Sequence, residues 1–168
     1  MSFDKDKIII KNEDGSKFYK IRYREGGRNS KIMFQIDHAR IPFGVDEEYE
    51  QYYITLEVRD VEYIEYIREI EDGLRDVLCE HLIDEGVLLD EIDIHTQIRK
   101  SKNGYFIKTK IPQYKNKFSV TCIDGGFHKS ILDVERGTWA TFVLYIDYAW
   151  IKEERIHYKW KIHRLEVE

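Results

Sequence analysis

The stretch that decides the fold is TWATFVLYIDYAW at residues 138–150, followed by YKWKIHRLEV at residues 158–167. Apolar and aromatic side chains alternate through both segments with the period of two that is typical of β-strands. The even positions from Ala140 to Trp150 are expected on one face, and the odd positions from Trp139 to Asp147 on the other. Because both faces carry apolar side chains, the pattern predicts a long strand that curves around a core, as in a small barrel, with residues 158–167 paired back on it.

Further strands are expected on the N-terminal side of this stretch. Asn103-Gly104 is a strong hairpin signal, which predicts that residues 92–100 pair with residues 105–111. Asp14-Gly15 is a turn signal of the same kind, and residues 46–50 are expected to form an acidic loop. The remaining predicted strands cover residues 7–11, 18–24, 31–41, 51–59, 118–123 and 128–132. The turns favour an antiparallel arrangement throughout.

Residues 60–85 form the principal predicted helix. Apolar side chains recur there at steps of three and four, and the opposite face is Glu, Asp and Arg. Asp60 is a plausible N-cap, Glu85-Gly86 ends the pattern, and Gly73 is expected to bend the helix. The apolar face should cover a sheet; docking of a partner protein on the acidic face is the alternative.

These elements predict a β-rich α+β fold. They favour an oligonucleotide/oligosaccharide-binding (OB) fold, which is a partly open antiparallel barrel of five strands, with one principal amphipathic helix. A single domain is expected over residues 1–168, with N-terminal strands in 1–59, the helix in 60–85 and C-terminal strands in 92–167.

The charge is distributed unevenly along the chain. The net charge is −5, but residues 42–93 hold 18 acidic and 3 basic residues, whereas residues 94–132 hold 8 basic residues and 1 acidic residue. A local field rather than the net charge attracts phosphates, so the basic segment indicates a nucleic-acid contact. The alternative is that these lysines only keep edge strands soluble.

The sequence carries no recognisable catalytic or metal-binding motif. The phosphate-loop, dinucleotide, zinc-protease and nucleophile-elbow patterns are all missing, so no catalytic residue, metal ligand or cofactor is predicted. Cys79 and Cys122 are expected to be reduced, buried hydrophobes. Acidic pairs such as Glu91 with Asp93 leave a carboxylate-dependent nuclease as a weak rival. Without a membrane-spanning run or a signal peptide, an intracellular, cytoplasmic location is expected.

The segment 105–111 has the side chains that single-stranded nucleic acid requires. Phe106, Lys108 and Lys110 share one face, so a ring that stacks a base lies beside cations that contact phosphates. The alternative is that Phe106 is a satellite core residue under lysine stems. The predicted nucleic-acid-binding residues are Arg99, Lys100, Lys102, Phe106, Lys108, Lys110, Tyr114, Lys115 and Lys117.

A resemblance to a known family accompanies these motifs. The segment from Asn103 to Lys110, the Asp-Gly-Gly turn at 124–126, LYIDYAW at 144–150 and the closing RLEV at 164–167 are similar to the single-stranded DNA-binding proteins of tailed phages and large DNA viruses. IPFGV at 41–45 also resembles the large-DNA-virus members. The resemblance covers residues 30–167.

The resemblance implies an OB-fold protein that coats displaced strands during viral DNA replication, recombination or repair, without catalysis. It places the hairpin around Tyr105 and the loop at Lys115–Lys117 against DNA, with RNA kept as an alternative ligand. Phage members end in an acidic tail that recruits partners, whereas this chain has its acid at residues 46–93, which would contact replication proteins instead. A homo-oligomer is left open. The alternative function is a structural or interaction protein of a virus or phage that docks a partner through its acidic helix.

Overall fold

The computed structural model describes residues 1–13 and 15–168, so Asp14 of the expected turn lies outside the described residues. The chain divides into two compact units, and the expectation of a single domain stays a prediction. The helix–sheet unit comprises Met1–Ile32, Ile64–Thr96 and Ile146–Lys159, and the barrel unit comprises Met33–Tyr63, Gln97–Tyr145 and Trp160–Glu168.

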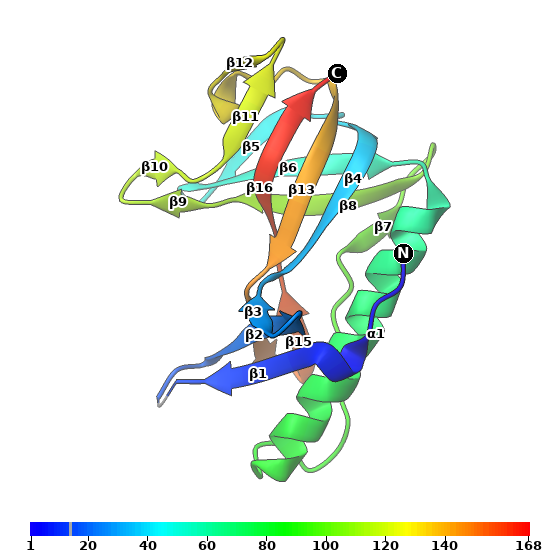
Figure 1. Ribbon diagram of the computed structural model, residues 1–168, viewed down its shortest axis with the longest axis vertical. Coiled ribbons are helices and arrows are strands. Elements are labelled where there is room, and N and C mark those ends of the chain that lie inside the picture. Colours follow the sequence, from blue (N-terminus) through cyan, green and yellow to red (C-terminus); the bar gives the residue numbers. More distant parts are fainter. Residues whose placement is uncertain (14) are drawn as a thin grey trace. The chain divides into compact units, whose positions relative to one another are not determined.

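The helix–sheet unit contains a long helix and a five-stranded antiparallel sheet. The strands follow the order β1–β2–β14–β15, and β3 pairs with β2 (Figure 1). The elements are η1 (Lys5–Lys7), β1 (Ile8–Asn12), β2 (Phe18–Glu25), β3 (Arg28–Ser30), α1 (Val61–Asp84), β14 (Tyr148–Lys152) and β15 (Arg155–Tyr158).

Helix α1 begins and ends close to where the sequence predicts. The Glu62 amide donates to Asp60 Oδ1 at 3.0 Å, so Asp60 is the N-cap. After the helix, Gly86 has a φ of +73°, the left-handed conformation that favours glycine at this place. Gly73 has a packing role, because a Cβ atom there would lie 2.8 Å from Cε1 of the Phe3 ring.

The inner face of this small sheet is buried together with α1. The rings of Tyr19 and His81 meet edge to face, with centroids 6.3 Å apart. Glu71 of α1 is buried, and Thr96 Oγ1 donates to both its carboxylate oxygens at 3.1 and 2.9 Å. Tyr158 Oη also donates to Glu71, at 2.5 Å. A buried carboxylate needs such donors, so these bonds link the helix to β15.

The barrel unit holds the other strands. They are β4 (Ile32–Arg40), β5 (Val45–Glu48), β6 (Gln51–Val58), β7 (Ile98–Lys100), β8 (Tyr105–Ile111), β9 (Gln113–Tyr114), β10 (Lys117–Phe118), β11 (Thr121–Asp124), β12 (Phe127–His128), β13 (Trp139–Ile146) and β16 (Trp160–Val167), with η2 (Ile131–Asp133).

Five of these strands close a ring in the order β4–β6–β8–β16–β13 and back to β4 (Figure 1). If β4, β6, β8, β13 and β16 are numbered 1 to 5 along the chain, their order around the ring is 1-2-3-5-4. The third and fifth strands, β8 and β16, run parallel, with Trp160 beside Thr109. The interior is apolar, and the Trp160 ring meets Phe34 edge to face at 5.1 Å. The β-rich α+β fold is confirmed, but the expectation of purely antiparallel pairing is wrong, because β16 also runs parallel to β11.

The long strand expected at residues 138–150 is two strands in two different sheets. β13 ends at Ile146, and the Asp147 carbonyl accepts a hydrogen bond from the Ile21 amide at 2.8 Å, where the chain passes to the small sheet. The alternation of buried and outward-facing side chains shifts by one residue at this break. Ile146 and Ala149 are both buried, so Tyr148 and Trp150 lie on the outer face instead of continuing the core positions of β13. The pairing of residues 158–167 is confirmed, also as two strands, β15 and β16.

Three local features complete the description of the barrel unit. His38, at a left-handed φ of 52°, is turned outward from β4 and stacks on Trp139 at 4.3 Å. Residues 46–48, expected in a loop, lie in β5, which pairs with β6. The hairpin of β7 and β8 is confirmed, but only residues 98–100 of the expected strand 92–100 pair with β8, and four residues connect the two strands. Gly104 is required because a Cβ there would lie 2.5 Å from the Val58 carbonyl oxygen.

Candidate nucleic-acid interface

Strand β8 has the two faces that its alternation predicts. Ile107, Thr109 and Ile111 are buried, and Thr109 Oγ1 donates to the Ile54 carbonyl oxygen at 2.7 Å. Phe106, Lys108 and Lys110 therefore point to the outer side of the barrel wall.

Neighbouring strands add cations to this outer side. Arg99 of β7 lies opposite Phe106. On the same edge of β8, farther along, Lys161 of β16 lies beside Lys110. We call Arg99, Phe106, Lys108 and Lys110 the β8 face. Four of the predicted site residues are thus brought together on one surface of the third barrel strand, β8, and the short strand β7.

Phe106 has an aromatic neighbour that the sequence interpretation did not include in the site. The ring of Phe43, in the connection between β4 and β5, meets Phe106 edge to face with centroids 5.4 Å apart. Phe43 is 55% exposed. The sequence signal that could have indicated Phe43 as a site residue was a large aromatic ring between Pro42 and Gly44, where no regular structure is expected. Phe106 is half-buried against Phe43 and so combines a packing role with an accessible edge.

Two carboxylates on or near the β8 face, those of Glu57 and Glu48, are engaged by cations. Glu57 lies opposite Phe106 and is buried, and its Oε1 accepts from Arg59 Nη2 at 3.1 Å. Lys108 Nζ donates to both carboxylate oxygens of Glu48 at 2.9 Å and lies 4.4 Å from the centroid of the Tyr53 ring. The ammonium group of Lys108 is thus already held by an anion.

The other predicted residues lie elsewhere on the barrel unit. Lys100 lies opposite Tyr105, on the other side of the sheet from Phe106, and Lys102 is exposed in the connection to β8. Tyr114 and Lys117 pair across the β9–β10 hairpin, and Lys115 Nζ is 5.3 Å from the centroid of the Tyr114 ring. Tyr114 is 69% exposed, so this hairpin presents a ring with two cations beside it.

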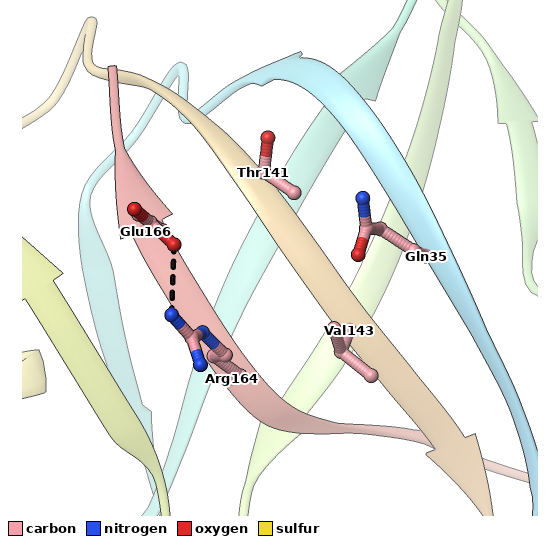
Figure 2. Close-up of a pocket in the computed structure, with 5 residues that line it drawn as sticks. All are labelled: Gln35, Thr141, Val143, Arg164 and Glu166. Atoms are coloured by element: carbon pink, nitrogen blue, oxygen red, sulfur yellow. Dashed lines mark hydrogen bonds and ion pairs between the residues drawn. The ribbon is translucent and has the colours of Figure 1, made fainter.

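A separate hollow lies on the outer side of β4, β13 and β16. Gln35, Thr141, Val143, Arg164 and Glu166 line a depression of about 520 Å³ (Figure 2). Arg164 Nη2 donates to Glu166 Oε2 at 2.9 Å, as the dashed line in Figure 2 marks. Its lining has no aromatic ring, so this hollow offers nothing for base stacking.

Within residues 1–13 and 15–168, no three His, Cys, Asp or Glu side chains are grouped so that they could hold a metal ion. Cys79 and Cys122 are buried and free, and burial raises the pKa of the Cys122 thiol above its usual value. No helix in the described part of the chain is long and apolar enough to span a membrane.

The closed ring of five strands in the order 1-2-3-5-4 gives this chain the OB fold. Its fold is that of the phage single-stranded DNA-binding proteins. The single-stranded DNA-binding protein of bacteriophage Enc34 has a TM-score of 0.56 at 10% identity over 96% of this chain and 89% of its own.

Two further solved structures share the fold. The T7 single-stranded DNA-binding protein gp2.5 has a TM-score of 0.57 at 11% identity, covering 82% of this chain and 86% of its own. The Enc34 protein in complex with single-stranded DNA has a TM-score of 0.53 at 12% identity, covering 97% and 96%. No protein-family model matches the sequence, and no curated protein is similar to it.

Proposed function

We propose that this chain binds single-stranded DNA without sequence specificity, and that it does so in viral DNA replication, recombination or repair by binding rather than by catalysis. The observation that carries the proposal is the β8 face. It lies on the third barrel strand, β8, which pairs with the second, β6, and the face of strands 2 and 3 is where OB folds bind oligonucleotides. Ammonium and guanidinium groups there would contact phosphates, and Phe106 with Phe43 would contact bases.

The solved structures with this fold support the proposal. Two of them are single-stranded DNA-binding proteins, and one of these was solved with single-stranded DNA bound. The β9–β10 hairpin, with Tyr114 between Lys115 and Lys117, is proposed as a further part of the same interface. Acidic residues of segment 46–93 are proposed to contact replication proteins. Docking through the acidic helix alone stays the alternative function.

The test is a double change, Lys108→Glu with Lys110→Glu. Binding of a labelled oligo-dT of about 30 nucleotides, followed by fluorescence anisotropy, should be lost at moderate salt. Each phosphate contact to a single strand contributes about 0.7 to the slope of log K against log salt, so loss of both contacts should also lower that slope by about 1.4. Circular dichroism should show an unchanged fold.

The matched control is Lys129→Glu with Arg164→Glu, which makes the same charge change elsewhere on the barrel unit. Lys129 and Arg164 are also ion-paired, with Asp124 and Glu166. The control should bind nearly as well as the unchanged protein. Undiminished binding by the Lys108/Lys110 variant would show that the proposed face is wrong, and no binding by the unchanged protein at low salt would overturn the function itself.

A further inference from the structure

The outer face of the small sheet in the helix–sheet unit carries a row of aromatic rings. Phe18 of β2, Trp150 of β14 and His157 of β15 are direct cross-strand neighbours. The Phe18 and Trp150 rings meet edge to face at 5.9 Å, and the Trp150 and His157 rings stack at 5.9 Å with an interplanar angle of 18°. His95 extends the row by stacking on His157 at 5.0 Å. The row therefore crosses three strands.

These rings are not needed to fill the core of the unit. The inner face of the same strands is closed by Tyr19, Ala149 and Tyr158, all of which are buried. Phe18 is 40% exposed, and Tyr148, which meets Phe18 edge to face at 6.3 Å, is 39% exposed. Exposed rings gathered on one sheet face are uncommon unless they meet a ligand or partner.

Cations surround the row on the same face. Lys17 Nζ lies 5.2 Å from the centroid of the Phe18 ring. Lys20 lies opposite Tyr148, and Lys152 lies opposite Arg155 at the end of the β14–β15 hairpin. Within residues 1–13 and 15–168, Lys20, Lys152 and Arg155 form no ion pair. Glu153 and Glu154 add opposing charges at the tip of the same hairpin.

We propose that this face, defined by Phe18, Lys20, Trp150, Arg155 and His157, is a second binding surface for single-stranded DNA. It rests on the proposed function but uses residues of the helix–sheet unit alone. An antiparallel sheet that is covered by a helix on one side and presents rings on the other is the arrangement that RNA-recognition motifs use to stack two or three bases. The surrounding cations favour a polyanion over an apolar protein segment, because their charge complements phosphates.

Photochemical cross-linking tests the surface directly. An oligo-dT carrying bromodeoxyuridine would be irradiated with the full chain, and the cross-linked peptides would be mapped. Cross-links are expected in segments 17–25 or 148–158. At low salt, where the second surface can still hold the oligonucleotide, they should persist in the Lys108→Glu/Lys110→Glu variant. Cross-links confined to residues 99–118 would overturn this inference while leaving the proposed function intact. The absence of any cross-link or binding would instead refute the proposed function.

Affinity measurements give a second test of the proposed surface. Trp150→Ala should weaken oligo-dT binding about 5- to 140-fold, the effect of losing one stacked base. The second variant, Lys20→Gln with Arg155→Gln, leaves the rings in place, so it tests the surface even if Trp150→Ala fails to fold. It should lower the slope of log K against log salt by about 1.4. Phe127→Ser, which removes an exposed ring of the barrel unit, is the control and should bind normally. Unchanged affinity in both surface variants, or binding of an acidic protein there in place of DNA, would overturn the assignment.

Discussion

Glu48 holds Lys108 in an ion pair, and its replacement by glutamine should strengthen DNA binding while slightly weakening the fold. Both carboxylate oxygens of Glu48 accept from Lys108 Nζ at 2.9 Å. A phosphate that contacts Lys108 must displace this carboxylate. Glu48→Gln removes the competitor and keeps the size of the side chain and the strand pairing of β5.

The magnitude follows from the exposure of the pair. The two side chains are 44% and 52% exposed, and exposed ion pairs contribute about 0.2–1 kcal/mol. At about 1.4 kcal/mol per tenfold change, returning that free energy to DNA binding improves the dissociation constant about 1.4- to 5-fold. The free energy of unfolding should fall by the same small amount, because the pair is present only in the folded state.

The assay is anisotropy of labelled oligo-dT at low and at moderate salt, since screening should shrink the gain as salt rises. Glu47→Gln is the matched control. It makes the same change of charge at the adjacent position of β5, whose side chain points to the opposite side of the strand. An equal gain in both variants would indicate a general charge effect, and an unchanged or weaker affinity in Glu48→Gln would refute the competition.

Three further predictions concern the helix–sheet unit. Tyr158→Phe removes a donor from the buried carboxylate of Glu71 and should lower the free energy of unfolding by about 1–3 kcal/mol in urea titrations; an unchanged midpoint would contradict this. Gly73→Ala should lower the melting temperature, because the added Cβ would lie 2.8 Å from the Phe3 ring and 3.1 Å from the Lys5 Cβ; the loss should be smaller in a Phe3→Ala background, where only the Lys5 contact remains, and an equal loss in both backgrounds would refute the packing role of Phe3. Burial would raise the pKa of Asp76, but hydrogen bonds from its cationic partners outweigh burial and lower it. The stabilisation is therefore present above the usual carboxyl pKa of about 3.9 and lost as pH falls through the lower folded value, so Asp76→Asn should flatten the pH dependence of unfolding in that acidic range.

The sequence predicted those features that depend on local periodicity. The faces of β8 and the N-cap at Asp60 follow from neighbours within a few residues, and both are confirmed. The position of Trp150 could not be predicted in this way. The alternation of buried and outward-facing side chains shifts by one residue at Asp147. The Asp147 carbonyl accepts a hydrogen bond from the amide of Ile21, a residue far away in the sequence.

The acidic strand β5 was missed for a different reason. Asp and Glu are poor strand formers, so residues 46–48 resemble a loop when they are considered alone. Pairing with β6 overrides that preference, although the turn that joins the strands consists of Tyr49 and Glu50, both with left-handed backbone and neither a glycine. The outward position of Phe43 likewise depends on its contact with Phe106 and not on any periodic pattern.

Strand β16 also determines when the barrel can form during synthesis. It pairs with β13, β8 and β11, so three strand edges depend on residues 160–167. Until the ribosome has released that segment, β8 and β13 have unpaired backbone groups and apolar inner faces, and such edges favour association between nascent chains. Ring closure therefore waits for residues 160–167, and a ribosome that stalls before residue 160 would leave the barrel unit in its most vulnerable state.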